Sequence, residues 1–97
     1  MTLDDITHDL ALLASQAAAS GDAEEGPGLI LLSADTWCRP GFHVQTEHTT
    51  ALRGIRHRNI RIWISSRFED RVLSRREARL QGSEDFEDFL PIASPEA

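Results

Sequence analysis

The sequence predicts a small α+β fold. It would be a two-layer domain with an N-terminal helix, a three-stranded antiparallel meander, a C-terminal helix and a short terminal helix. Apolar residues recur at three- and four-residue spacing near the N-terminus and alternate with polar residues in the middle of the chain. The segments between the candidate strands are too short for parallel crossovers. A length of 97 residues accommodates one hydrophobic core, so residues 1–97 are expected to form a single domain.

The first helix is expected over residues 3–20, where the apolar positions share one face. Two acids follow Thr2 in its first turn, where the helix dipole favours negative charge. Gly21 is a natural helix stop, because glycine adopts the left-handed conformation without steric cost. Residues 21–28, GDAEEGPG, are predicted to be an acidic linker between the helix and the sheet.

Three strands are predicted in the middle of the chain. Residues 29–34 are short, apolar and flanked by breakers, which is typical of a central strand. Residues 42–52 and 59–65 alternate in polarity, and the chain is expected to reverse between them at 53–58. The isoleucines of the third strand share one face, and both long helices are expected to pack on it.

A second helix is predicted over residues 66–81, since Ser66 and Glu69 form a capping-box pattern and a glycine follows the helix. One or two further helical turns are expected over 84–90, before a proline ends them. Residues 91–97 have little to bury and are expected to form a frayed tail.

The charges are segregated along the chain. Residues 53–79 hold nine of the ten arginines against three acids, so this stretch carries +6 although the formal net charge of the protein is −6. Residues 1–35 contain seven acids and no base, and residues 84–97 contain five acids and no base. A basic stretch of this kind indicates an anionic partner or compensation by the acidic ends of the same chain.

Four arginines within the second predicted helix are spaced by four residues. On a helix, Arg67, Arg71, Arg75 and Arg79 form one ridge, and among the acids of that helix only Asp70 is placed to pair with Arg67. The ridge is therefore expected to need an anion from elsewhere: nucleic-acid phosphates, an acidic protein surface, or the acidic ends of this chain.

The strand before this helix adds an aromatic residue to the basic surface. Arg61 and Trp63 are expected on one strand face, with Arg56 and Arg58 in the approach to it. Arginine and tryptophan are enriched in the residues that dominate protein interfaces. The same combination binds single-stranded nucleic acid, in which arginine holds phosphate and tryptophan stacks on a base.

We therefore predict a non-enzymatic protein-interaction module, of the small accessory or inhibitor type, that binds an acidic partner surface. The alternative is a nucleic-acid-binding accessory protein using the same surface, and a small ribonuclease using His57 is the third interpretation. No cofactor is expected, and no metal, because His43 and His48 fall on opposite faces of a strand. The residues predicted to bind the partner are Arg56, Arg58, Arg61, Trp63, Arg67, Arg71, Arg75 and Arg79.

The remaining features concern location and self-association. A single cysteine, the absence of a signal peptide and the absence of a long apolar run predict a cytoplasmic protein with no membrane partner. A homodimer through Phe86, Phe89 and Leu90 is one alternative, and packing of these residues within the monomer is the other.

Residues 29–41, LILLSADTWCRPG, locally resemble the active-site segment of the thioredoxin family, a strand followed by Trp-Cys-x-Pro-Cys. Trp37, Cys38 and Pro40 match this segment, but Gly41 occupies the position of the second cysteine. Disulfide exchange needs that second thiol to complete within one chain. No function is therefore carried over from the resemblance.

Overall fold

The computed structural model describes residues 2–42, 47–48 (backbone only), 54–67, 69–84, 86–87 and 89. It has an N-terminal helix, a mixed sheet and a C-terminal helix, which confirms the α+β class. Along the chain the elements are α1 (Leu3–Ser20), η1 (Ala23–Glu25), β1 (Pro27–Leu32), α2 (Ala34–Trp37), β2 (Glu47–His48), β3 (Ile55–His57), β4 (Ile60–Ile64), β5 (Arg71–Ser74) and α3 (Arg75–Leu80).

Helix α1 begins and ends where the sequence predicts. The Thr2 hydroxyl accepts a hydrogen bond from the Asp5 amide at 3.2 Å, and the Asp5 carboxylate accepts one from the Thr2 amide. This reciprocal capping satisfies backbone donors that the first turn would otherwise leave free. At the other end, Gly21 adopts the left-handed conformation with φ of 73°. Ile6 and Leu10 are fully buried against the sheet.

The strand order is β2-β3-β4-β1-β5, which only roughly matches the predicted antiparallel meander. Strands β2, β3 and β4 are antiparallel neighbours, but β1 pairs in parallel with β4 and antiparallel with β5. Every residue of β1 is buried, so this strand needs a partner on each edge and cover on both faces. Strand β1 can pair in parallel with β4 because the segment between them, which contains α2, β2 and β3, is long enough for a crossover connection.

The prediction of one helix over residues 66–81 was wrong. Residues 71–74 form β5, and only residues 75–80 form α3. Val72 packs in the cluster on one sheet face and Leu73 in the cluster on the other, which is the alternation of a strand. The capping box that opens the helix is formed by Ser74 and Glu77, eight residues after the one expected.

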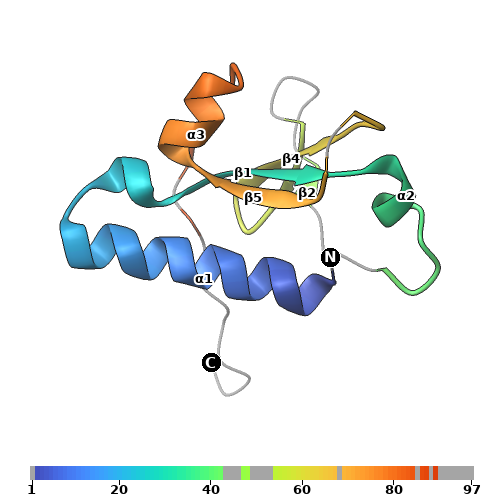
Figure 1. The fold of residues 1–97 in the computed structure, drawn as a ribbon, viewed down its shortest axis with the longest axis horizontal. Helices are drawn as coiled ribbons and strands as arrows, with labels where there is room; N and C mark the ends of the chain where they lie inside the picture. Colours follow the sequence, from blue (N-terminus) through green and yellow to red (C-terminus); the bar gives the residue numbers. More distant parts are fainter. Residues whose placement is uncertain are drawn as a thin grey trace.

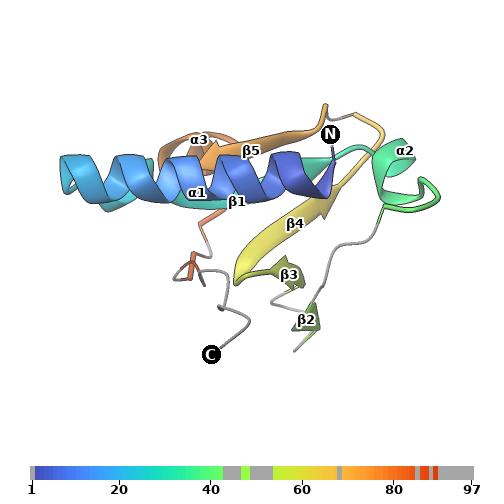
Figure 2. The same cartoon turned by 90° about the horizontal axis from the view of Figure 1, so that it is seen from below.

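Helices α1 and α3 lie on opposite faces of the sheet. The prediction that both helices pack on the isoleucine face was therefore wrong. Figure 1 shows α1 on one side of β1 and β5 and α3 on the other. The α1 side holds Ile6, Leu10 and the buried isoleucines of β4, whereas the opposite side holds Leu29, Leu73 and Ala78. In Figure 2, α1 crosses the β1 and β5 half of the sheet, and β3 and β2 extend beyond it.

The described residues between 83 and 89 are not helical, contrary to the prediction of a short terminal helix. Phe86 packs against the cluster on the α3 side and Phe89 against the cluster on the α1 side. A helix would have placed these two rings on one face. Both rings pack within the monomer, while Leu90 and the tail 91–97 lie outside the described residues.

Candidate functional site

The predicted ridge of four arginines does not exist as one helix face. Arg67 lies in the turn after β4, Arg71 begins β5, and Arg75 and Arg79 lie in α3. A strand turns its side chains to alternate sides, so a four-residue spacing does not keep one direction across the junction of β5 and α3. The prediction was wrong because it extended the helix through β5.

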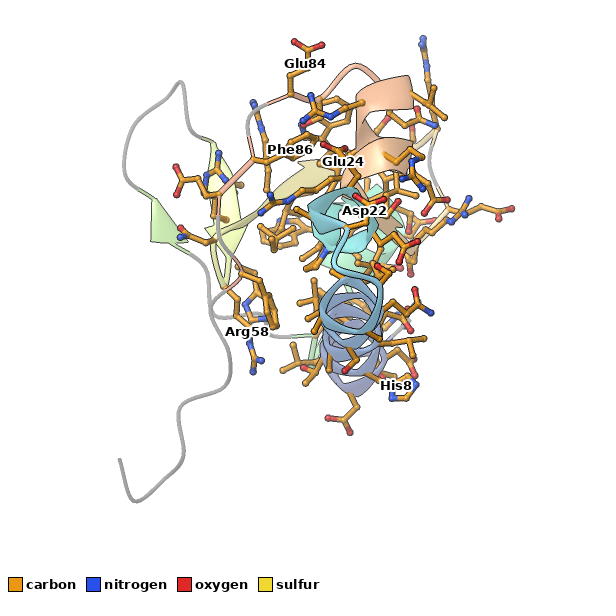
Figure 3. All side chains as sticks on the ribbon, turned by 90° about the vertical axis from the view of Figure 1, so that its left-hand side faces the viewer. His8, Asp22, Glu24, Arg58, Glu84 and Phe86 are labelled. Atoms are coloured by element: carbon orange, nitrogen blue, oxygen red, sulfur yellow. The ribbon has the colours of Figure 1, made fainter. Side chains whose placement is uncertain are left out.

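The arginines of α3 are bound by acids of the same chain. The Arg79 Nε and Nη2 groups donate to the two Glu24 carboxylate oxygens at 2.9 and 3.0 Å, and the guanidinium lies 4.8 Å from the centroid of the Phe86 ring. Arg76 pairs with Asp22 at 2.7 Å. The hydrogen bond from Arg79 lowers the pKa of Glu24 below its usual value. Figure 3 shows Asp22 and Glu24 beside α3.

Two further cations of this region are also engaged internally. Arg71 pairs with Glu77 at 2.5 Å, and Arg75 donates to the backbone carbonyl of Glu87 at 3.0 Å. The acidic linker 21–28 thus supplies the carboxylates for two arginines of α3, and α3 itself supplies the one for Arg71. Arg71, Arg76 and Arg79 are thus each paired with a carboxylate of the same chain, whereas Arg75 is bonded to a backbone carbonyl.

The other half of the basic stretch forms the β3–β4 hairpin, residues 55–64. Its two-residue turn has positive φ at both positions, 51° at Arg58 and 68° at Asn59, which is the pattern of a type I′ turn. Asparagine tolerates this conformation well, whereas an arginine there carries a strain of about 1 kcal/mol. The prediction of a chain reversal over 53–58 was wrong in its position, because residues 55–57 form β3 and the turn lies at Arg58 and Asn59.

Arg61 and Trp63 lie on the face of β4 opposite the buried isoleucines, as predicted. Trp63 packs with Leu31 and its neighbours on the α3 side of the sheet. The Arg61 guanidinium lies 6.0 Å from the centroid of the Trp63 ring. Gly54 is the other neighbour of Arg61. If residue 54 carried a Cβ, that atom would lie 3.2 Å from Arg61 Nε. The guanidinium is therefore held close to both the Gly54 backbone and the tryptophan ring.

Arg56 was predicted to bind the partner but lies inside the protein. Only 1% of its surface is exposed, and its Nη1 group donates to the Asn59 carbonyl at 2.9 Å. It stands opposite Arg61 in the β3–β4 pairing. Arg56 consequently stabilises the hairpin turn and does not present a surface for a partner.

Three predicted site residues have no ion pair among the residues that the structure describes. Within the described part of the chain, no carboxylate forms an ion pair with Arg58, Arg61 or Arg67. Partial burial without such a partner lowers the pKa of Arg58 from its usual value. Figure 3 shows Arg58 on the hairpin side of the molecule, away from Asp22 and Glu24. The structure thus brings Arg58 and Arg61 together on the β3–β4 hairpin and leaves Arg67 beyond the far end of β4.

A polar cluster that the sequence analysis missed lies at the carboxyl end of β1. The Asp70 carboxylate accepts hydrogen bonds from the Ser33 amide at 2.8 Å and from the Thr36 hydroxyl at 2.6 Å. Partial burial disfavours the charged form of Asp70, but these hydrogen bonds outweigh it and lower its pKa to about 2. The Asp70 carboxylate therefore accepts hydrogen bonds from the start of α2 and connects this helix to the turn before β5.

The described residues contain no group of side chains placed to hold a metal ion. Cys38 is an exposed free thiol, and no group of three or more His, Cys, Asp or Glu side chains in this part of the chain is placed to hold a metal. His57 is only 6% exposed and, two residues after Ile55, lies on the α1 side of the sheet, opposite to Arg61. The ribonuclease interpretation therefore lacks an accessible base. His43 and the side chain of His48 lie outside the described residues.

A shallow cavity of about 340 Å³ lies between the second half of α1 and the start of β1. Its walls are mainly alanine, glycine and proline residues, with Phe89 and one charged residue, Arg75. It lies apart from the β3–β4 hairpin, and its lining contains no acid or nucleophile. The cavity consequently adds no chemistry to the candidate surface.

Comparisons with protein-family models, curated proteins and solved structures find no match for this chain. None of the helices in the described part of the chain has the length and apolar character that crossing a bilayer requires.

Proposed function

We propose that this protein is a non-enzymatic interaction module that binds an acidic surface of a protein partner through the β3–β4 hairpin. The observation that carries the proposal is the contrast between the two halves of the basic stretch. Arg76 and Arg79 are paired with acids of their own chain, whereas Arg58 and Arg61 have no such partner among the described residues. Arginine and tryptophan are enriched among the residues that dominate binding at the centre of an interface.

Trp63 favours a protein over a nucleic acid as the partner. Stacking on a base requires an open ring face. Here the ring packs against the Leu29, Leu31 and Leu73 cluster, and the Arg61 guanidinium lies near it. The net charge of −6 also repels a polyanion as a whole, while a local cationic hairpin can still orient an acidic protein patch.

The test measures binding of a fluorescent deca-glutamate peptide by anisotropy at low salt. A double charge reversal on the hairpin, Arg58→Glu with Arg61→Glu, is compared with Arg39→Glu and Arg67→Glu, which change the same charge on exposed turns. We expect the hairpin variant to weaken binding by at least about tenfold and the matched variant by less than about threefold.

A second readout locates the contact. In a nitrogen-proton correlation spectrum, the Trp63 indole signal is expected to shift on addition of the peptide, and the indole of Trp37, the last residue of α2, serves as an internal control. Equal losses of affinity in the two double variants, or an unmoved Trp63 signal, contradict the proposal. Tighter binding of a single-stranded oligothymidine than of the peptide would instead assign the surface to nucleic acid.

A further inference from the structure

The position of Arg61 suggests what kind of contact the hairpin makes. Its guanidinium lies against Gly54, where a Cβ would come within 3.2 Å of Nε, 3.5 Å of Nη2 and 3.6 Å of Cζ. On the same sheet face, the Trp63 ring centroid lies 6.0 Å from Cζ, within range of a cation–π contact. Gly54 also has φ of 70°, a conformation that glycine adopts without strain. Both neighbours restrict the arginine before any partner is present.

A guanidinium that is already restrained loses less conformational entropy on binding than a mobile one. An arginine loses side-chain conformational entropy when a partner immobilises it. Contacts that already hold the side chain reduce this loss. The planar fork of N–H donors also matches a carboxylate in two parallel hydrogen bonds, which the single ammonium of lysine cannot reproduce.

Arg58 offers a different kind of charge. It lies at the tip of the hairpin, two residues before β4 turns Arg61 toward the α3 side of the sheet. No aromatic contact or hydrogen bond holds its guanidinium among the described residues. Its contribution to an acidic partner is that of a point charge, which lysine supplies equally well.

We propose that Arg61 is a prepositioned two-pronged donor for one aspartate or glutamate carboxylate of the partner, and that Gly54 and Trp63 are its positioning residues. This inference rests on the proposed function, since it names the chemistry by which the hairpin recognises an acidic partner. It assigns specificity to Arg61 and long-range attraction to Arg58.

Charge-conserving variants test the assignment. With the deca-glutamate peptide as the probe, Arg61→Lys is expected to lower affinity by about tenfold, whereas Arg58→Lys and the distant Arg67→Lys change it by less than about twofold. Gly54→Ala is expected to weaken binding by about fivefold or more, although it removes no charge, because the new methyl displaces the guanidinium. Thermal melts of each variant show whether the fold is kept.

A second measurement does not depend on the fold of the Gly54 variant. In the free wild-type protein, the side-chain Nε of Arg61 is expected to show a larger heteronuclear NOE than that of Arg67, because its neighbours restrict it. A folded Gly54→Ala protein is expected to lower this NOE at Arg61. If Arg61 Nε is as mobile as Arg67 Nε, the prepositioning is refuted.

The outcomes separate this inference from the proposed function. Loss of binding in the charge-reversed hairpin, with full affinity in Arg61→Lys, overturns the two-pronged contact and leaves the acidic partner standing. Full affinity in the charge-reversed hairpin overturns both. If the oligothymidine binds with the same dependence on Arg61, the acceptor of the Arg61 hydrogen bonds is a phosphate. That result contradicts the proposal of a carboxylate acceptor.

Discussion

Replacing Asp70 by asparagine tests how the end of β1 is tied to the turn before β5. The Asp70 carboxylate accepts from the Ser33 amide and the Thr36 hydroxyl, and Thr36 is only 2% exposed. Asparagine keeps one acceptor oxygen and replaces the other by a donor group, so one of these hydrogen bonds is lost. The change therefore alters charge and hydrogen bonding while the size of the side chain is preserved.

The pKa of Asp70 sets the expected magnitude. The fall from the usual 3.8 to about 2 corresponds to about 2 kcal/mol of stabilisation of the charged form, and screening by water at this partly exposed carboxyl reduces this to about 1 kcal/mol. Because the folded-state pKa is the lower one, this stability is present above the unfolded-state pKa. It is lost as the pH falls from about 4 through about 2.

The assay is urea unfolding followed by tryptophan fluorescence, at pH values from about 7 down to about 2. The wild type is expected to exceed Asp70→Asn in unfolding free energy by about 1–2 kcal/mol at neutral pH, and the difference shrinks in the acid range. Asp35→Asn is the matched control, because Asp35 is an exposed acid in α2, and its change is expected to stay within about 0.5 kcal/mol. A difference that stays constant down to the lowest pH would refute the reasoning.

Three other predictions concern how the helices are fixed. Gly28→Ala is expected to destabilise the protein by about 2–3 kcal/mol in urea unfolding, since the new Cβ would lie 2.6 Å from a backbone atom of the first residue of α3; a neutral result contradicts this packing. Leu10→Ala is expected to cost about 2–5 kcal/mol and the half-exposed Leu12→Ala under about 1 kcal/mol, so equal costs would argue against the face of α1 described above. Glu24→Gln is expected to lower the melting temperature slightly at low salt through loss of the Arg79 pair, and a deficit that persists undiminished at about 1 M salt would exclude a mainly electrostatic origin.

Part of the candidate surface could be predicted from the sequence. Period-two alternation placed Arg61 and Trp63 on one face of a strand, and the structure has them there. The internal ion pairs of the α3 arginines could not be predicted, because Arg76 and Arg79 pair with acids more than fifty residues earlier in the chain. The sequence showed that the linker was acidic, but nothing local indicated which cations it would meet.

The second helix shows why local signals were ambiguous. Ser-x-x-Glu occurs at Ser66 and again at Ser74, and either one fits a capping box. The residues between them suit a helix or a strand, and periodicity over so few positions does not distinguish the two. The fully apolar β1 resolved the choice, because a strand buried on both faces needs a hydrogen-bonded neighbour along each edge.

Local sequence patterns were sufficient to predict α1 with both of its ends, the buried character of β1, the two faces of β4 and the segregation of charge. Each of these depends on residues within a few positions of one another, so local periodicity and capping are sufficient to predict them. The parallel pairing of β1 with β4, the strand at β5 and the internal pairing of Arg76 and Arg79 became visible only in the folded protein. Those features depend on contacts between distant segments, whose free energy is gained only when the whole sheet assembles.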